Sequence, residues 1–385
     1  LDRLDKSLIE ASLDLGAGHL RTLMKIVVPL AGPGILAGVM ITLIPALGAY
    51  LTPDLMGGTE SQMIANVIER QFKRANDWPF GAALSFLLIY AMFINAARQG
   101  KGGALMSLFK RTPVAPLEYT RKTWMRGWVG ATMFFLYAPL LILMIFSFND
   151  SKRNVVWKGF TLKYYEKAMN NDSLVEAMVN SLTIAGLATV FSLVLGALAA
   201  VMLWRFRFPF KGAVEGTMSL PIIVPEICLG VAFLIFFAKI EWPTDLPWPL
   251  NLSAITIAHI TFCFPFVAMV VRSRLESFNK EEEEAAKDLG ASEWQTFRDI
   301  LLPHMKPGLI AGALLSFTLS LDDFVITFFT SGPDTITFPV KVYSMVRFSV
   351  TPEVNAASTI LIILTIVLTA VALKLQGVKA IAESH

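Results

Sequence analysis

Four acidic residues lie within or beside long apolar stretches of this sequence, where ionisable side chains are rare. Asp322 and Asp323 interrupt one apolar stretch. Glu226 follows Pro225 in a second, and Asp54 lies near the end of a third. A carboxylate in an apolar layer is energetically costly, so such residues are candidates for a substrate or ion pathway. These carboxylates could replace part of the hydration that a cation loses as it crosses the layer.

Aromatic residues near these acids could add a second kind of contact. Tyr50 precedes Asp54, and Phe324 follows Asp323. Trp78 is a further aromatic candidate. The face of an aromatic ring attracts an ammonium group. The pattern therefore favours a pathway for a cation, which requires no nucleophile and no acid–base catalyst.

Each acid also has a structural alternative. Neighbouring residues on a helix point about 100° apart, so Asp322 and Asp323 are not both expected to line a pathway. One of them can instead cap backbone groups or hydrogen-bond to a neighbouring helix. Asp54 also suits a turn, and Glu226 also suits a helix break that is exposed to water.

Other residues with ligand chemistry have simpler interpretations. His259 lies in an apolar stretch and is expected to hydrogen-bond between helices, not to bind a metal or relay protons. Cys228 and Cys263 lie in apolar runs and are expected to be small core residues. We therefore predict no catalytic residue and no metal site.

The composition indicates the kind of protein that must position these residues. Hydrophobic residues make up 55% of the chain and charged residues 16%, with a mean hydropathy of +0.58. Soluble domains carry about a quarter charged residues, so an all-α, multi-pass membrane protein is predicted. The net charge of +3 gives no indication of nucleic-acid binding.

Eight segments have about the 20 apolar residues that a spanning helix needs: 34–52, 79–97, 128–148, 178–203, 214–238, 252–271, 308–330 and 356–375.

Basic residues in the short loops predict the orientation of these spans. The loop after the fourth span contains Arg205, Arg207 and Lys211. The positive-inside rule assigns such loops to the cytoplasm, and the assignment alternates along the chain without conflict. The connection after the second span is also strongly basic, through Arg98, Lys101, Lys110, Arg111, Arg121, Lys122 and Arg126.

A repeated segment divides the chain into related parts. Residues 10–17 (EASLDLGA) return as 284–291 (EAAKDLGA), each before an apolar stretch. Two homologous halves are therefore predicted, each with a polar loop before a membrane helix. The match continues at one constant offset through the pairs Ile26/Ile300, Pro29/Pro303, Pro33/Pro307, Gly34/Gly308, Ala37/Ala311 and Gly38/Gly312.

The second copy of this loop predicts a helix–turn–helix. Asn279 and the acidic run 281–284 suit a helix start, where the helix dipole favours negative charge. Gly290 permits a sharp turn. We expect Pro307 to open the following membrane helix. An ordinary amphipathic loop, duplicated only through gene ancestry, is the alternative.

These loops resemble the EAA loop of ABC-importer permeases, in which a short cytoplasmic helix docks into an ATPase subunit. The chain itself has no G-x-x-x-x-G-K-[ST] motif, so a partner subunit would bind ATP and no cofactor is expected here. The resemblance implies ATPase coupling by Glu10, Ala11, Gly16, Pro29, Glu284, Ala285, Gly290 and Pro303.

Further motifs resemble the permease subunits PotB and PotC of spermidine/putrescine ABC importers. Segments 259–263 (HITFC) and 315–323 (LSFTLSLDD) resemble PotC, and 52–58 (TPDLMGG) resembles PotB. The resemblance implies a type I ABC-importer fold in the bacterial inner membrane. The implied parts are the end of a PotB-like subunit (1–97), a basic cytoplasmic linker (98–126), a complete six-span PotC-like subunit (127–376) and a cytoplasmic tail (377–385).

The same resemblance implies partners and a cargo. It implies a PotA-like ABC ATPase, a PotD-like extracytoplasmic binding protein, and the rest of the PotB-like subunit in the lipid bilayer. The implied cargo is a polyamine, a flexible multivalent cation that suits Asp322, Asp323, Glu226, Asp54, Tyr50 and Phe324. The alternatives are a permease for another organic cation or small solute, an ion-coupled secondary transporter, and a membrane-embedded enzyme.

Overall fold

The computed structural model describes residues 6–57, 62–99, 123–151, 156–240, 250–332, 335–348 and 352–375. These residues form helices joined by turns and loops, with an isolated antiparallel bridge between Asn149 and Phe160. The chain divides into two compact units. The first comprises Leu1–Leu136 and Ile223–Cys228, and the second comprises Tyr137–Ile222 and Leu229–His385.

Long apolar helices confirm the prediction of a multi-pass membrane protein. Among the described residues, five helices are long and apolar enough to cross a membrane, and a bent helix pair adds a possible sixth span. The predicted spans 34–52 and 79–97 fall on two further helices, α3 and α6. The five are Arg126–Phe146, Asp172–Arg205, Leu252–Leu275, Glu293–Asp322 and Pro352–Val371.

The repeat extends well beyond the loop from which it was predicted. Lys6 and Lys280, the first residues of α1 and α14, are 274 positions apart, and every later pair of elements begins at that same offset. The first repeat contains α1 (Lys6–Asp14), α2 (His19–Thr22), the π-helix η1 (Leu23–Val27), α3 (Val28–Gly48), α4 (Leu51–Met56), α5 (Ile64–Lys73) and α6 (Trp78–Gln99). The second contains α14 (Lys280–Asp288), α15 (Glu293–Thr296), the π-helix η3 (Phe297–Leu301), α16 (Leu302–Asp322), α17 (Val325–Thr330), α18 (Phe338–Phe348) and α19 (Pro352–Leu375).

Six more helices lie between the repeats among the residues that the structure describes. They are α8 (Thr123–Phe146), α9 (Lys163–Met169), α10 (Asp172–Arg205), α11 (Lys211–Ile223), α12 (Glu226–Lys239) and α13 (Leu252–Leu275).

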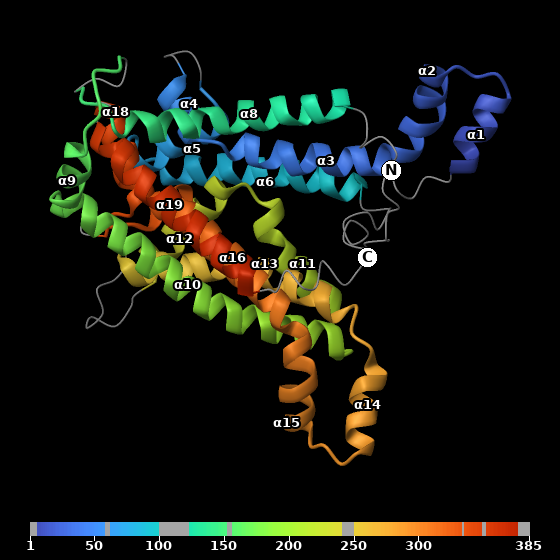
Figure 1. The fold of residues 1–385 in the computed structure, drawn as a ribbon. Helices are drawn as coiled ribbons and strands as arrows, with labels where there is room; N and C mark the ends of the chain where they lie inside the picture. The colour runs from blue at the N-terminus through green and yellow to red at the C-terminus, as the bar shows by residue number, and fades with distance from the viewer. Residues whose placement is uncertain are drawn as a thin grey trace. The chain divides into compact units, whose positions relative to one another are not determined.

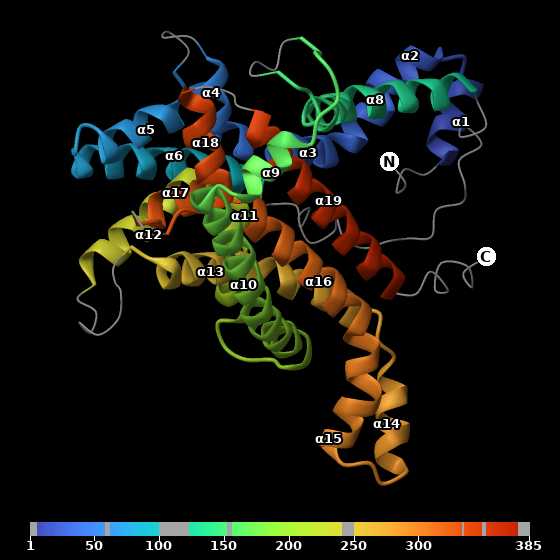
Figure 2. The same ribbon diagram turned by 60° about the vertical axis from the view of Figure 1, so that its left-hand side comes forward.

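Helices α10, α13 and α16 pack together in the second unit (Figures 1 and 2). Val267 on α13 lies between two glycines. A Cβ atom on Gly196 of α10 would come within 2.7 Å of the Val267 Cβ, and one on Gly312 of α16 within 3.1 Å of its Cγ1. Small residues of this kind let membrane helices approach closely. The apolar cluster around Val267 also contains Ala200, Val271, Leu275, Phe278, Leu301 and Met305.

Three predicted spans are not continuous helices. The span 34–52 ends as a helix at Gly48 and resumes at Leu51. The span 214–238 divides into α11 and α12, which are bent by 109°. The span 308–330 ends as a helix at Asp322 and resumes at Val325. The segments 214–238 and 308–330 do lie on apolar helices, but their breaks were not located, because an average of hydropathy does not detect a change in backbone direction.

The prediction that Pro307 opens a membrane helix was wrong. Pro307 lies inside α16, and Pro303 occupies its first turn. A proline in the first turn lacks only an N–H group that would have no helical partner there.

Parts of the predicted domain organisation lie outside the described residues. These parts are residues 100–122 of the linker and the whole tail 377–385. Helix α6 extends to Gln99 and α8 begins at Thr123, so described helices include both ends of the predicted linker.

Candidate functional site

The break between α16 and α17 contains the acidic pair. Asp323 leaves the helix with an extended backbone (φ −61°, ψ 123°), and Phe324 starts the next helix. The buried Asp323 carboxylate accepts hydrogen bonds from Thr327 N at 2.8 Å, Thr327 Oγ1 at 3.0 Å and Ile326 N at 3.4 Å. It therefore satisfies backbone donors at the start of α17 that have no helical partner.

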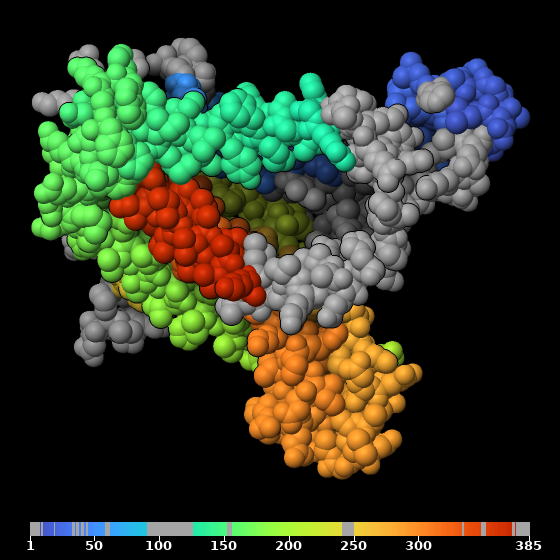
Figure 3. Space-filling model, in the orientation of Figure 1, coloured from blue at the N-terminus to red at the C-terminus, as the bar shows by residue number. Residues whose placement is uncertain are grey.

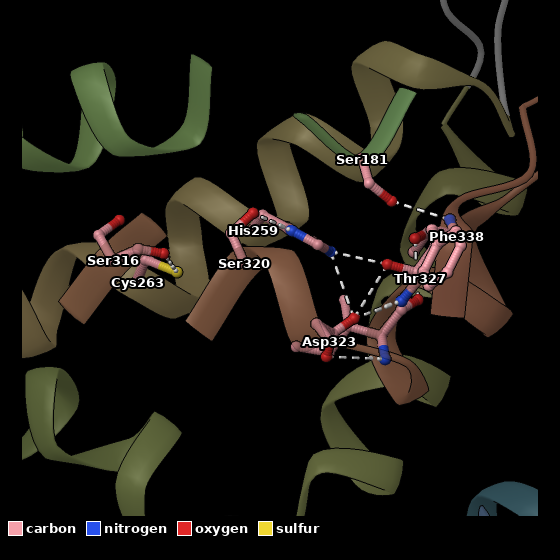
Figure 4. Close-up of polar contacts among 10 residues, drawn as sticks. Ser181, His259, Cys263, Ser316, Ser320, Asp323, Thr327 and Phe338 are labelled. Carbon is pink, nitrogen blue, oxygen red and sulfur yellow. Dashed lines mark hydrogen bonds and ion pairs between the residues drawn. The ribbon is translucent and has the colours of Figure 1, made fainter. Parts of the chain in front are cut away.

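His259 connects this break to α13 (Figure 4). Its Nδ1 lies 2.7 Å from Ser320 Oγ, and its Nε2 lies 2.9 Å from Thr327 Oγ1 and 3.3 Å from Asp323 Oδ2. Both ring nitrogens thus have partners on α16 or α17. The prediction that His259 hydrogen-bonds between helices is confirmed.

The two neighbouring aspartates occupy different environments. Asp323 is 8% exposed and faces His259, whereas Asp322 is exposed. The ring of Phe324 is buried and packs 5.0 Å from Tyr343 and 5.3 Å from Phe328, measured between ring centroids. Of this group, Asp322 is the residue whose side chain is exposed.

The first repeat has an equivalent break without the acids. Ala49 and Tyr50 adopt nearly the same backbone angles as Asp323 and Phe324. Tyr50 is 1% exposed, and its carbonyl accepts a hydrogen bond of 3.2 Å from Asn66 Nδ2. Because Ala49 occupies the position of Asp323, the side-chain cap is specific to the second repeat.

Two other predicted pathway residues belong to the first unit. Asp54 is half-buried in the first turn of α4, within a helical turn of Tyr50. Glu226 is exposed at the start of α12, directly after the bend. A Cβ on Gly48 would lie 3.0 Å from the Pro225 Cβ and 3.5 Å from the Glu226 nitrogen, so this bend packs closely against the end of α3.

The predicted helix–turn–helix is present as α14, a turn and α15, here called the coupling hairpin (residues 279–296). Asn279 caps α14 by accepting a hydrogen bond from Glu281 N, and Ser292 forms a capping box with Gln295. Gly290 adopts a φ of 88°, in the left-handed region that favours glycine. The hairpin projects beyond the helices that it joins (Figure 3).

The predicted coupling residues lie on the exposed surface of this hairpin. Glu284, Ala285 and Gly290 are exposed, as is Pro303 at the start of α16. Leu289 is 90% exposed and Trp294 66% exposed. In the first repeat Ala11, Gly16 and Pro29 are likewise exposed, and the side chain of Glu10 lies outside the described residues. The counterparts of Leu289 and Trp294 at the 274-residue offset are Leu15 and Leu20, which are 87% and 74% exposed.

An ionic network attaches the coupling hairpin to the end of α10. Arg205 contacts both Glu283 oxygens, at 2.6 and 3.2 Å, and lies 3.6 Å from Glu293. Lys287 lies 3.0 Å from Glu283 and 2.8 Å from Glu293. Burial alone would raise the pKa of Glu283, but hydrogen bonds from Arg205 and Lys287 outweigh it and lower that pKa.

Sequence reasoning missed several members of these clusters. Ser320 and Thr327 were not singled out, although polar residues at 316, 320, 323 and 327 follow helical spacing in an apolar stretch. Arg205 was read only as a cytoplasmic charge, because its partner Glu283 is distant in sequence. Among the described residues, no group of three or more His, Cys, Asp or Glu side chains could hold a metal ion.

Comparisons with known proteins agree with this architecture. Residues 1–99 and 192–378 match the family model described as "Binding-protein-dependent transport system inner membrane component". Over 242 residues, 63% of this chain and 89% of the relative, the sequence is 43% identical to "Spermidine/putrescine transport system permease protein PotC" of Escherichia coli K12.

Two more distant likenesses cover larger shares of the chain. The sequence is 24% identical over 383 residues to "Probable ABC transporter permease protein y4fN" of Sinorhizobium fredii, which covers 95% of this chain and 66% of the relative. A crystal structure of a bacterial ABC transporter involved in alginate import matches with a TM-score of 0.52 and 18% identity. That match covers 67% of this chain and 98% of the other, and it supports the fold alone.

Proposed function

This chain belongs to the family of binding-protein-dependent transport system inner membrane components, the permeases of ABC importers, and we propose that its cargo is a polyamine. The observation that carries the proposal is the 43% identity to a spermidine/putrescine permease. Family membership also favours an ATP-driven permease over the ion-coupled carrier and the membrane-embedded enzyme that were considered above.

The exposed acids support a cationic cargo. Asp322 lies at the break after α16, and Glu226 lies at the bend before α12. Both carboxylates are exposed at places where a membrane helix is interrupted. Interrupted helices in transporters line cavities that hold water or substrate, so these positions suit transient contacts with ammonium groups.

The coupling hairpin supports an ATPase partner. Its exposed surface combines the acidic residue Glu284 with the apolar Leu289 and Trp294. A large exposed apolar side chain on a polar projection is typical of a docking surface. In this proposal the coupling hairpin and its counterpart in the first repeat, here called the first hairpin (α1, the following turn and α2), dock into PotA-like ATPases. A PotD-like extracytoplasmic protein delivers the substrate.

The repeat supports a further membrane partner, the remainder of a PotB-like subunit. In the second repeat Gly312 packs against Val267 of α13. Its counterpart Gly38 is exposed, and no described atom lies within 4 Å of the position that a Cβ would take. Helix α3 therefore has room for a helix equivalent to α13. The likeness to one relative along 95% of this chain supports a natural fusion of the two parts.

Uptake by the reconstituted importer tests the cargo. The full-length permease, its ATPase and its binding protein would be placed in proteoliposomes with radiolabelled spermidine or putrescine, with and without internal ATP. We expect ATP-dependent uptake that excess unlabelled polyamine suppresses. ATP hydrolysis without polyamine uptake would exclude the polyamine and retain the importer permease.

A further inference from the structure

The end of α10 holds the coupling hairpin from two sides. On one side, the Trp204 ring packs 5.8 Å from the Phe278 ring, and the Lys280 ammonium lies 5.7 Å from the Trp204 ring centroid. On the other side, Arg205 binds Glu283 through both carboxylate oxygens. Two consecutive residues of one membrane helix thus contact both the start and the middle of α14.

The ionic side of this attachment combines a forked ion pair with a network of charges. Isolated surface ion pairs contribute little, but forked arginine–carboxylate pairs and charge networks are the exceptions. The Glu283 side chain is only 12% exposed and the Arg205 side chain 33%. Lys287 and Glu293 extend the pair into a network of four charges that includes both arms of the hairpin.

Apolar packing beside the network is incomplete. A partly open pocket of about 180 Å³ lies between the end of α10 and the hairpin, with Arg205, Glu283 and Glu293 in its wall. Side chains that line such a pocket have fewer apolar neighbours on that side. The attachment of the hairpin to α10 at this place therefore includes the ionic contacts of Arg205 and not apolar packing alone.

The first repeat lacks the network. At the 274-residue offset, Ile9, Leu13 and His19 replace Glu283, Lys287 and Glu293. The first hairpin is instead closed internally, by a hydrogen bond of 2.9 Å between the side-chain oxygens of Ser12 and Thr22. The ionic attachment to a membrane helix is thus a feature of the coupling hairpin in the second repeat.

We propose that Arg205 is a positioning residue that makes α10 a further lever of the coupling hairpin, in addition to the covalent connections to α13 and α16. A displacement of α14 by the ATPase would then move α10 together with α13 and α16, which pack against α10 and each other at Val267. This proposal rests on the proposed docking of an ATPase on the hairpin. Loss of the network would leave the ATPase bound and active, but less cargo would be transported for each ATP hydrolysed.

A double-mutant cycle in the reconstituted importer tests this proposal. The variants are Arg205→Gln, Glu283→Gln and the two combined, with Arg207→Gln as the matched control. Arg207 is an exposed arginine two residues further along the chain and is not part of the network. Three quantities are measured: ATPase retained on purification, ATP hydrolysed, and labelled polyamine transported per ATP.

The expected result separates coupling from assembly. Each single variant should retain the ATPase and hydrolyse ATP, but transport at least about fivefold less cargo per ATP. The combined variant should be no worse than the more severe single variant, because both changes remove one interaction. Arg207→Gln should behave like the unsubstituted importer, and Arg205→Lys should show an intermediate loss because it keeps the charge but not the fork.

Three results would overturn the proposal. They are unchanged transport per ATP in Arg205→Gln, additive losses in the combined variant, and equal losses in Arg205→Gln and Arg207→Gln. Failure of the unsubstituted permease to retain an ATPase would instead remove the docking surface itself, and the lever with it. Loss of ATPase in the variants alone would assign Arg205 to assembly and not to coupling.

Discussion

At the scale of single residues, adjacent aspartates have different tasks. Asp323 accepts three hydrogen bonds from the start of α17 and lies beside His259, whereas Asp322 is exposed. Consecutive residues on a helix point in different directions, so the side chains of Asp322 and Asp323 face different environments. We therefore interpret Asp323 as a helix cap, and the proposed contact with solute is assigned to Asp322.

Replacing each aspartate by the uncharged asparagine should therefore have different effects at the two positions. Asp323→Asn replaces a carboxylate that accepts three bonds, so we expect it to lower stability by about 1–3 kcal/mol. Asp322→Asn should leave stability unchanged and reduce polycation uptake. Thermal unfolding of the purified permease and uptake in proteoliposomes would be measured for both variants. Equal effects on stability would contradict the assigned roles.

At the scale of elements, close helix packing depends on glycines that face one valine. Val267 fills the space left by Gly196 and Gly312. Interiors are packed densely enough that one added methyl group must displace a neighbour. The contact of α10, α13 and α16 is therefore sensitive to side-chain volume at these positions.

Alanine substitutions along α10 test this packing. Gly196→Ala should destabilise the permease by about 1–3 kcal/mol, because the new Cβ would overlap Val267 and approach the Phe264 carbonyl oxygen at 2.9 Å. Gly186→Ala is the matched control, since no described atom lies within 4 Å of its Cβ position. It should be neutral or slightly stabilising in a helix. Val267→Gly removes both contacting carbons, so the loss in the combined variant should be smaller than the sum of the two single losses in thermal unfolding. Additive losses would place the strain at the Phe264 carbonyl.

At the scale of the whole molecule, a repeat of seven elements is combined with helices that have no counterpart in the first repeat. The two repeats share helix boundaries and backbone angles at their breaks, but they differ in side chains with functional roles. Ala49 occupies the position of Asp323, and Leu13 the position of Lys287. The same backbone framework thus supports two different sets of contacts.

Chemical labelling tests how this framework lies in the membrane. Glu282→Cys, in the coupling hairpin, should react with a membrane-impermeant maleimide only from the cytoplasmic side. Lys158→Cys, in the loop before α9, should react only from outside. Both positions are exposed, whereas the native Cys228 and Cys263 are buried, so the unsubstituted protein is the control. Reaction of both new cysteines from one side would contradict the predicted topology.

The sequence by itself determined the membrane class, the family, the helix–turn–helix and the existence of the repeat. These features follow from local properties: hydropathy over about 20 residues, loop charge, capping residues and a recurring motif. Only the tertiary structure decided which aspartate caps α17, that Arg205 binds Glu283, and that Val267 lies between two glycines. Each of these depends on side chains from different helices, and their approach is decided by packing and backbone direction, which local sequence patterns do not encode.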